Sequence, residues 1–431
     1  MARPRKNTPK PNTQELSLVP VEEQPYPLPE GWKWVRLGDV ASKISDGSHN
    51  PPKNSGSGIP LLSATNIQDR TVRIEDATRW ITEDEWQLEN KRTKIEINDI
   101  LITIVGTLGR VALVTNPKFA LQRSVAVIKT NQNQTYISYF FESPYVQDFI
   151  NKNAKGTAQK GFYLKALEKL CCALPPLDEQ ERIVTRIESL FAKLDKAKEK
   201  AGAVLDSYET RKAAILHKAF TGELTATWRE ETGLAFEWKE KTLADIGTIV
   251  TGSTPSTKHP EYYGKEVPFI KPTDLNAGRY VIQSTEYLSK EGVKVSRPVK
   301  AGSTCVCCIG TISKCGFLLC NAVTNQQINT ICPYDFMHDL FVYYWCTSST
   351  FKQTLIENSS ATTLPIINKS RMSALPIPVP TLPEQQEITR ILDSLLEKEQ
   401  QSKEAAETVL EQIDLMKKAI LAKAFRGELG N

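Results

Sequence analysis

One short segment of the chain contains the core of a motif that grips an extruded nucleobase. Residues His49 to Lys53 read His-Asn-Pro-Pro-Lys. Adenine methyltransferases hold a flipped base with Asn-Pro-Pro followed by an aromatic side chain that stacks on it. Lys53 takes the aromatic position here, and no glycine-rich cofactor loop follows a strand nearby. We therefore expect that this chain does not itself transfer methyl groups.

Other catalytic patterns are missing or unspecific. No Gly-x-x-x-x-Gly-Lys-Ser/Thr segment is present to cradle nucleotide phosphates. Glu89-Asn90-Lys91 has a nuclease-like Glu-x-Lys spacing, but such triplets are common in charged helices. The four histidines are widely scattered, so no pairing of a nucleophile with a base stands out. The sequence predicts a non-catalytic chain that binds no cofactor.

The nine cysteines indicate reduced thiols. Adjacent pairs, Cys171-Cys172 and Cys307-Cys308, lie in apolar segments, which is untypical of a secreted disulfide framework. The region from Cys305 to Cys320 holds five cysteines but lacks the paired Cys-x-x-Cys knuckles of zinc sites, and Cys305 to Ile309 has the pattern of a buried strand. The apolar run 340–346 is far shorter than the roughly 20 residues of a membrane helix. We expect no metal site and a cytoplasmic protein.

Two parts of the chain have loops rich in side chains that bind nucleic acids. Base edges are read by Arg, Lys, Asn, Gln, Ser and Thr, and phosphates bind Lys, Arg and hydroxyls. The candidates in residues 31–174 are His49, Lys53, Asn54, Ser63, Thr65, Asn66, Gln68, Arg110, Lys155, Thr157, Gln159 and Lys160. Those in residues 231–378 are Thr251, Ser253, Thr254, Ser256, Thr257, Lys258, Lys271, Thr273, Asn276, Lys314, Ser359, Ser360, Thr362 and Thr363. Ordinary turns have the same composition, so we expect only part of this set to contact DNA.

Two pairs of positions recur at the same spacing. Gln122 and Gln326 are 204 residues apart, as are Arg110 and Lys314. A glutamine can bond adenine through two hydrogen bonds, but its repetition in both halves favours a shared structural hydrogen bond. Arg110 and Lys314 follow a glycine turn and fit a shared phosphate contact.

Positive charge is concentrated in the same two parts of the chain. Residues 31–174 have 19 lysines and arginines against 14 acidic residues, and residues 231–378 have 14 against 12. The C-terminal residues 379–431 have a net negative charge. This distribution favours two segments that contact phosphates, joined by segments that contact protein, although a surplus this small also occurs on ordinary solvated surfaces.

An internal repeat fixes the organisation of the chain. Pro-x-Leu-x-Glu-Gln-x-x-Ile at 175–183 recurs 205 positions later at 380–388, and Lys-Ala-Phe-x-Gly-Glu-Leu at 218–224 recurs at 423–429. Between these motifs the two copies align without a gap. Each copy has acidic residues in its first turn and a glycine, Gly222 or Gly427, where a helix C-cap would fall.

Both copies predict a long helix with a coiled-coil seam. Apolar residues recur at alternating spacings of four and three, which is the 3.5-residue period of paired helices. The residues expected to pair the helices are Ile183, Ile187, Leu190, Leu194, Ala201, Val204, Ile388, Leu392, Leu395, Val409 and Ile413. Arg211, Glu399 and Ser402 interrupt the seam, so a helix that packs on its own domain is the alternative.

The two segments that precede the helices share a skeleton but little else. Leu37-x-Asp39-Val40 matches Leu243-x-Asp245-Ile246, and Gly106-Thr107 matches Gly310-Thr311. Short β-rich runs broken by Gly and Pro predict a mixed α/β (α+β) domain. We expect recognition domains at 31–174 and 231–378, helical spacers at 175–230 and 379–431, and a flexible, proline-rich arm at 1–30.

This arrangement predicts a pseudo-twofold protein with two unlike readers. The helices can pair antiparallel, and each would span roughly 60 Å at 1.5 Å per residue. DNA-reading elements on successive major grooves are about 34 Å apart. A stiff helical pair would therefore set the gap between two half-sites of a bipartite, asymmetric target.

The order of these motifs resembles the specificity subunit of type I restriction-modification systems. The opening Gly-Trp-x-Trp-x-x-Leu-Gly-Asp at 31–39, the Gly-Thr-x-Gly turn at 106–109 and the repeated helix motifs carry the resemblance, which extends from about residue 31 to the end. Ser313 replaces the last glycine of the turn in the second copy. The resemblance implies two target recognition domains and two helical regions that bind two modification subunits, with motor-nuclease restriction subunits joining them. It also implies that the partners, not this chain, use S-adenosylmethionine, ATP and Mg. A coiled-coil scaffold or regulator that does not bind DNA is the alternative.

Overall fold

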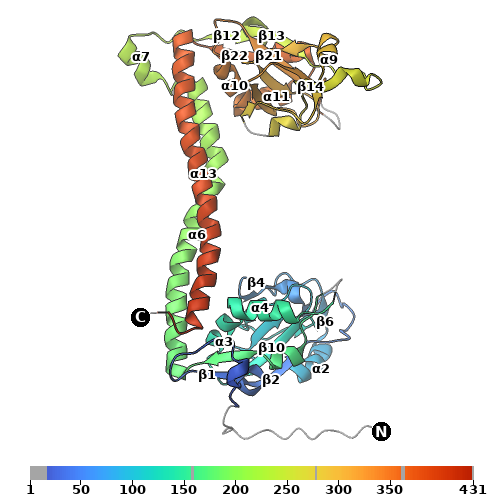
Figure 1. Ribbon diagram of the computed structural model, residues 1–431, viewed down its shortest axis with the longest axis vertical. Helices are drawn as coiled ribbons and strands as arrows, with labels where there is room; N and C mark the ends of the chain where they lie inside the picture. The colour runs from blue at the N-terminus through green and yellow to red at the C-terminus, as the bar shows by residue number, and fades with distance from the viewer. Residues whose placement is uncertain (1–16, 157–159, 277–278, 361–364, 430–431) are drawn as a thin grey trace. The chain divides into compact units, whose positions relative to one another are not determined.

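The computed structural model describes residues 17–156, 160–276, 279–360 and 365–429, with the side chain of Asn276 outside the description. The chain forms two compact units (Figure 1). The first contains the described part of Met1–Ala201 and Thr408–Asn431, and the second contains Gly202–Glu407. Among the described residues, no helix combines the length and apolar character needed to cross a bilayer.

The first domain is built on a four-stranded antiparallel sheet of order β2-β10-β7-β8. Its strands are β2 (Ala41–Asp46), β7 (Ile100–Thr103), β8 (Val111–Leu113) and β10 (Val125–Thr130). Successive residues of a strand point to opposite faces, and here both faces are covered. Ile100 and Ile102 pack in the main core, whereas Leu101 on the same strand packs in a second core on the other face. Because both faces are buried, β7 and most of β10 are continuous apolar runs rather than alternating ones.

Smaller elements complete this domain. Strand β1 pairs with β11 in antiparallel register, which joins the beginning of the domain to its end. The remaining strands are β3 (Ile59–Leu62), β4 (Ile67–Gln68), β5 (Thr71–Val72), β6 (Trp80–Ile81) and β9 (Ala120–Leu121), with β1 (Lys33–Arg36) and β11 (Cys171–Leu174). The helices are α1 (Leu37–Val40), α2 (Glu83–Thr93), α3 (Gln134–Glu142), α4 (Pro144–Asn153) and α5 (Leu164–Glu168). Helix α3 contributes most of the buried aromatic side chains of the main core.

The second domain repeats this plan. Its main sheet has the order β13-β21-β18-β19-β15, and β12 pairs with β22 as β1 does with β11. Its strands are β12 (Lys239–Thr242), β13 (Gly247–Thr251), β14 (Tyr263–Ile270), β15 (Tyr280–Val281), β16 (Tyr287–Leu288), β17 (Pro298–Val299), β18 (Thr304–Cys307), β19 (Cys315–Leu318), β20 (Ala322–Thr324), β21 (Ile328–Pro333) and β22 (Pro376–Val379). Its helices are α8 (Leu243–Ile246), α9 (Lys290–Lys294), α10 (Asp339–Thr347), α11 (Ser349–Glu357) and α12 (Lys369–Ser373). The predicted mixed α/β fold class with an internal repeat is confirmed.

The two repeated segments form the long helices α6 (Leu177–Phe220) and α13 (Leu382–Ala424), and a short helix α7 (Ala226–Thr232) follows α6. Within the second unit the helices run antiparallel, since Arg211 pairs with Glu399 at 2.7 Å while Tyr208 bonds to Gln400. Within the first unit Asp195 pairs with Lys417 at 2.6 Å. Two of the three polar interruptions of the predicted seam, Arg211 and Glu399, are therefore ion-pair partners.

The seam residues near each domain contribute both to the core of that domain and to the pairing of the two helices. Ile183 and Ile187 are buried in the core of the first domain together with Phe425 from the end of α13. Ile388 and Leu392 are buried in the second domain's core with the end of α6. Both alternatives from the sequence therefore hold in part, because the same residues pack on their own domain and on the other helix.

The other predicted seam residues differ in burial. Ala201 and Ile413 are buried, and Leu190, Leu194, Val204 and Leu395 are half-buried. Val409 was predicted to lie in the seam between the helices, but 37% of its surface is exposed. Its neighbours along the same stripe, Ala406 and Ile413, are buried.

The expectation of a flexible arm does not hold for residues 17–30. Val19 is buried, and its amide donates to Trp34 O at 2.9 Å. The Tyr26 hydroxyl donates to Phe425 O at 3.0 Å, and burial raises the pKa of that phenol well above its usual value. Prolines and few apolar residues suggested mobility, but a few anchoring side chains are enough to hold this segment. Residues 1–16 lie outside the described residues.

All nine cysteines are described and all are free thiols. Cys305 and Cys307 lie on the fully buried strand β18, as the pattern of that run predicted. Burial raises the pKa of the Cys305 thiol to about 12, so it stays protonated at neutral pH.

A buried carboxylate fixes the beginning of α13 to the segment that follows α6. Glu384 is 2% exposed and accepts hydrogen bonds from Thr225 Oγ1 at 2.7 Å, from Trp238 Nε1 at 3.0 Å and from the Arg229 guanidinium. Its counterpart in the first repeat, Glu179, is half-buried and pairs with Arg182 at 2.7 Å. The same residue type thus has a structural role in one copy and a minor one in the other.

We predict that Glu384→Ala lowers the free energy of unfolding of the second unit by about 3 to 5 kcal/mol, because it leaves the Arg229 guanidinium buried without a counter-charge. Urea denaturation, with hydrogen exchange of α7 and the first turn of α13, would measure this. Glu179→Ala is the matched control and should cost less than about 1 kcal/mol. Equal losses in the two variants would contradict this account.

Candidate nucleic-acid interface

In the first domain, a tight turn at Gln122–Ser124, between β9 and β10, is the point where several loops meet. Ser48 N donates to Leu121 O at 2.7 Å, and Gln122 N donates to Leu62 O at 2.8 Å. Ile104 N donates to Ser124 O at 2.8 Å. Backbone bonds therefore hold the turn against the loops after β2, β3 and β7.

The second domain builds the same turn from different residues. Ser253 N donates to Thr324 O at 2.8 Å, Asn325 N to Ile270 O at 3.0 Å, and Cys308 N to Gln327 O at 2.7 Å. Each of these bonds has its counterpart in the first domain. Because the bonds use backbone atoms, the frame persists where the side chains differ.

This frame corrects the pairing of Gln122 with Gln326. The equivalent bonds align Gln122 with Asn325, and Arg123 with Gln326. The segment from Lys314 to the turn is one residue shorter than the segment from Arg110, which shifts the register after β19. The two glutamines therefore occupy different positions, and the shared structural hydrogen bond does not exist.

A glycine closes the frame in both domains. A Cβ atom on Gly47 would collide with the carbonyl oxygen of Leu121, and one on Gly252 with the carbonyl oxygens of Thr324 and Asn325. Only hydrogen fits between the strand end and the turn, so both positions require glycine for steric reasons.

The first candidate loop follows β2 and is partly held by its own polar side chains. His49 is half-exposed, and its Nε2 lies 2.7 Å from Asp46 Oδ2, while Asp46 Oδ1 pairs with Arg92. Asn54 Oδ1 accepts from the amides of Gly56 and Trp80 at 3.1 and 3.0 Å. Lys53 is exposed. Of the three predicted residues here, Lys53 is the most available to a ligand.

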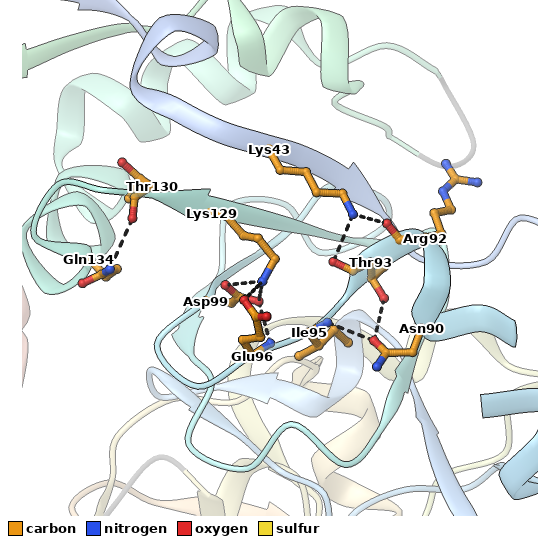
Figure 2. A network of polar contacts seen from close by, with 10 residues as sticks. All are labelled: Lys43, Asn90, Arg92, Thr93, Ile95, Glu96, Asp99, Lys129, Thr130 and Gln134. Atoms are coloured by element: carbon orange, nitrogen blue, oxygen red, sulfur yellow. Dashed lines mark hydrogen bonds and ion pairs between the residues drawn. The ribbon is translucent and has the colours of Figure 1, made fainter. Parts of the chain in front are cut away.

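A network of lysines anchors the base of this region (Figure 2). Lys43 on β2 donates to the carbonyls of Arg92 and Thr93 at the C-terminal end of α2, where a cation is favourable. Lys129 on β10 binds Asp99 and Glu96, each at 2.7 Å, and its ammonium lowers the pKa of Glu96. Burial and the nearby Lys129 lower the pKa of Lys43. Lys43 thus fixes the end of α2 to the sheet, and Lys129 fixes the segment that follows α2.

In the second candidate loop, Ser63 to Gln68, the prediction that Asn66 contacts DNA is wrong. Asn66 is buried, and its side chain accepts from Ser63 N at 3.0 Å and donates to Arg73 O at 3.2 Å. It closes the turn and is not available to DNA. Thr65 is exposed, whereas Ser63 and Gln68 are half-buried, with Gln68 Nε2 bonded to Thr65 O at 2.7 Å.

The basic candidates around the glycine turn are exposed. Arg110 lies beside the turn, with its guanidinium 3.4 Å from Ile67 O. Lys155 and Lys160 lie in a hairpin closed by mutual backbone bonds between Lys155 and Gly161, and Gly106 N donates to Lys160 O at 3.0 Å. Thr157 and Gln159 lie outside the described residues.

In the second domain, some of the candidate side chains are exposed and others are half-buried, and several of them form hydrogen bonds or ion pairs. Thr254, Ser256, Thr257, Lys258 and Thr273 are exposed. Thr251, Ser253, Lys314, Ser359 and Ser360 are half-buried, and Thr251 Oγ1 bonds to Asn329 at 2.7 Å. Lys271 pairs with Glu286. Thr362, Thr363 and the side chain of Asn276 lie outside the described residues.

Arg123, which is not among the residues predicted from the sequence, is exposed at the centre of the first turn. The gap-free spacing of 204 residues paired Gln326 with Gln122, so the correspondence of Arg123 with Gln326 was not apparent from the sequence. An alignment with a one-residue deletion after Lys314 would have placed Arg123 opposite Gln326.

These two domains, each with loops of basic, amide and hydroxyl side chains gathered on one rigid turn and each followed by a long amphipathic helix, define an internally duplicated recognition protein. Residues 29–202 and 236–412 each match the family model of the type I restriction modification DNA specificity domain. The chain therefore belongs to the type I restriction-modification DNA specificity family.

Individual relatives agree with this assignment. The type I restriction enzyme EcoBI specificity subunit of Escherichia coli is 32% identical over 211 residues, 47% of this chain and 44% of that protein. The HindI specificity subunit of Haemophilus influenzae is 28% identical over 262 residues, 50% of this chain and 57% of that protein. The chain thus spans about half the length of these curated relatives.

A solved structure shares the fold. Its title describes complex assembly and conformational transition of the type I R-M system, and its chain superposes with a TM-score of 0.71 at 19% identity. The match covers 94% of this chain and 100% of that chain. At this identity the likeness concerns the fold alone.

We predict that Gly47→Ala displaces the first turn and lowers stability by about 1 to 3 kcal/mol, because a methyl group collides with backbone that cannot move away. Thermal unfolding and hydrogen exchange at Gln122–Val125 would measure the effect. Gly202→Ala, at a helical site where an added Cβ would meet nothing within 4 Å beyond its chain neighbours and its own helix backbone, is the control and should be neutral or slightly stabilising. A fully tolerated Gly47→Ala would show that the turn is not rigid.

Proposed function

We propose that this chain is the sequence-specific DNA-binding subunit of a type I restriction-modification complex. The observation that carries the proposal is that one backbone frame occurs twice and presents unlike side chains, within a chain of the DNA specificity family. Each domain would then read one half-site of double-stranded DNA. The family match favours this function over that of a DNA-independent scaffold.

The target that follows is bipartite and asymmetric. Two domains with different loop residues read different sequences, unlike the two identical halves of a homodimer. The long helices α6 and α13 would space the domains, so that the number of unread base pairs between the half-sites is fixed. The recognition domains at 31–174 and 231–378 and the spacers at 175–230 and 379–431 are the parts of this proposal.

The chain would supply specificity without catalysis. Two modification subunits would methylate adenine with S-adenosylmethionine, and restriction subunits would use ATP and Mg to move along and cleave DNA. The exposed faces of the helical regions are the surfaces that we assign to the modification subunits. A cytoplasmic location follows from this function, since the chain must meet cellular DNA.

Methylation mapping tests the proposal as a whole. We expect that cells supplied with this chain and its modification subunits acquire adenine methylation in a split motif with two unlike halves at a constant gap. Cells without this chain serve as the control. A continuous or palindromic motif, or methylation that does not depend on this chain, would refute the proposal.

The exposed lysines of the first hairpin supply a second test. Lys155→Ala and Lys160→Ala should each weaken binding to all DNA sequences alike and reduce the slope of log K against log salt by about 1, because each removes one phosphate contact. Fluorescence anisotropy over a salt series measures both effects. Lys193→Ala, an exposed cation on α6, should leave the slope unchanged. An unaltered slope in all three variants would remove this hairpin from the interface.

A further inference from the structure

We propose that Arg123 and Gln326 are the same base-reading position in the two domains, with Arg123 selecting guanine in one half-site and Gln326 selecting adenine in the other. This inference rests on the proposed function and deepens it. The basis is the equivalence of the two turns.

The backbone places the two residues in corresponding positions. Val125 N donates to Gln122 O at 3.1 Å, and Ile328 N donates to Asn325 O at 3.1 Å, so each turn is closed by the same bond around its central residue. The strands that follow, β10 and β21, are interior strands, each second from an edge of its sheet. A side chain carried by such a turn is positioned precisely enough for hydrogen bonds to a base edge.

A flanking side chain of each turn bonds to its neighbours, while the central side chain is exposed. In the first turn, Ser124 Oγ accepts from Ala64 N at 3.0 Å. In the second, Asn325 is 7% exposed, and its Oδ1 and Nδ2 both bond to Gln327 at 3.1 Å. Arg123 and Gln326 are the exposed residues of their turns.

Arg123 stands apart from the other arginines of its domain. Arg36, Arg70, Arg73 and Arg92 form ion pairs with carboxylates. The Arg79 guanidinium donates to Pro52 O at 2.8 Å, and Arg110 contacts Ile67 O. Across the part of the chain that the structure describes, the Arg123 guanidinium has no partner, so its donors are available to a ligand.

Gln326 is oriented by a neighbour. The hydroxyl of Thr254 donates to Gln326 Oε1, which holds the side-chain amide in one direction. The oxygen keeps a second lone pair, and Nε2 keeps both its hydrogens. The amide can therefore accept one hydrogen bond and donate another on the same side.

The chemistry of the two side chains leads to different bases. A guanidinium donates two parallel bonds to O6 and N7 of guanine, whereas a glutamine amide accepts from N6 and donates to N7 of adenine. Both pairs of atoms lie in the major groove. A common frame with these two side chains would give half-sites that differ at one corresponding position.

Exchanging the two side chains tests the inference. The full chain, assembled with its modification subunits, is presented with DNA in which both half-sites are randomised, and bound sequences are counted for the wild type, Arg123→Gln and Gln326→Arg. We expect Arg123→Gln to change one guanine of one half-site to adenine, and Gln326→Arg to change one adenine of the other half-site to guanine. Each variant should bind the original target roughly 10- to 100-fold more weakly, while the other half-site and the gap are unchanged.

Two controls separate the outcomes. Arg73→Gln removes a surface arginine of the same domain that is paired with Asp69, and it should keep the wild-type sequence preference. Arg123→Lys should keep the preference for guanine, because lysine also donates to O6 and N7. If one exchange variant fails to assemble, the other still tests the equivalence from its own half-site.

An unchanged sequence preference in Arg123→Gln would overturn the inference. If this variant also binds all sequences equally more weakly, Arg123 is a phosphate contact. A wild-type complex that selects no split motif would instead refute the proposed function.

Discussion

The core of each domain is completed by helices that come from distant parts of the chain. Phe425, at the end of α13, packs edge-on against Tyr136 and Phe140 with ring centroids 5.2 and 5.1 Å apart. In the second unit, Phe220 at the end of α6 packs in the same way against Phe341 and Trp345. Burying these aromatic rings removes a large apolar area from water, so neither core closes without the helix end that belongs to it. The repeat Lys-Ala-Phe is therefore conserved between the two halves of this chain because both cores need the same ring.

This packing separates the residues that hold the fold from those that can vary. The sheets, the helix ends and the turns between β9 and β10 and between β20 and β21 depend on apolar side chains and backbone bonds. The exposed side chains at those turns take no part in the backbone bonds that form the frame, so arginine in one turn and glutamine in the other are both compatible with it. A protein that reads two sequences with one fold needs this separation, since a change of target must not unfold the reader.

Electrostatics follows the same division. Many basic side chains of the first domain are engaged in internal pairs, such as Lys129 with Asp99 and Arg70 with Glu142. The small positive surplus of the sequence therefore does not describe a uniformly basic surface. Four exposed cations, Lys53, Arg110, Arg123 and Lys160, lie in the loops around the turn at Gln122–Ser124, where we propose that they contact phosphates or base edges.

Much of the architecture could be predicted from the sequence. The 205-residue repeat, the 3.5-residue apolar period and the Gly C-caps are local or periodic signals, and they identified the two long helices. The buried strand from Cys305 was likewise apparent from its apolar run. The skeleton residues shared by the two globular segments identified one fold used twice.

The site residues were less accessible, because their roles depend on partners distant in the chain. Asn66 and Thr65 are similar polar residues of one loop, yet only the packing of Arg73 against that loop decides that Asn66 is buried and bonded. Glu384 differs from Glu179 only because Thr225, Arg229 and Trp238 surround it. Residue identity and spacing by themselves determined the repeat, the helices and the class of the protein. Only the tertiary structure decided which turn residues are equivalent and which side chains face solvent. The segment before the second turn is one residue shorter, and the backbone bonds, not the residue spacing, show which positions of the two turns correspond.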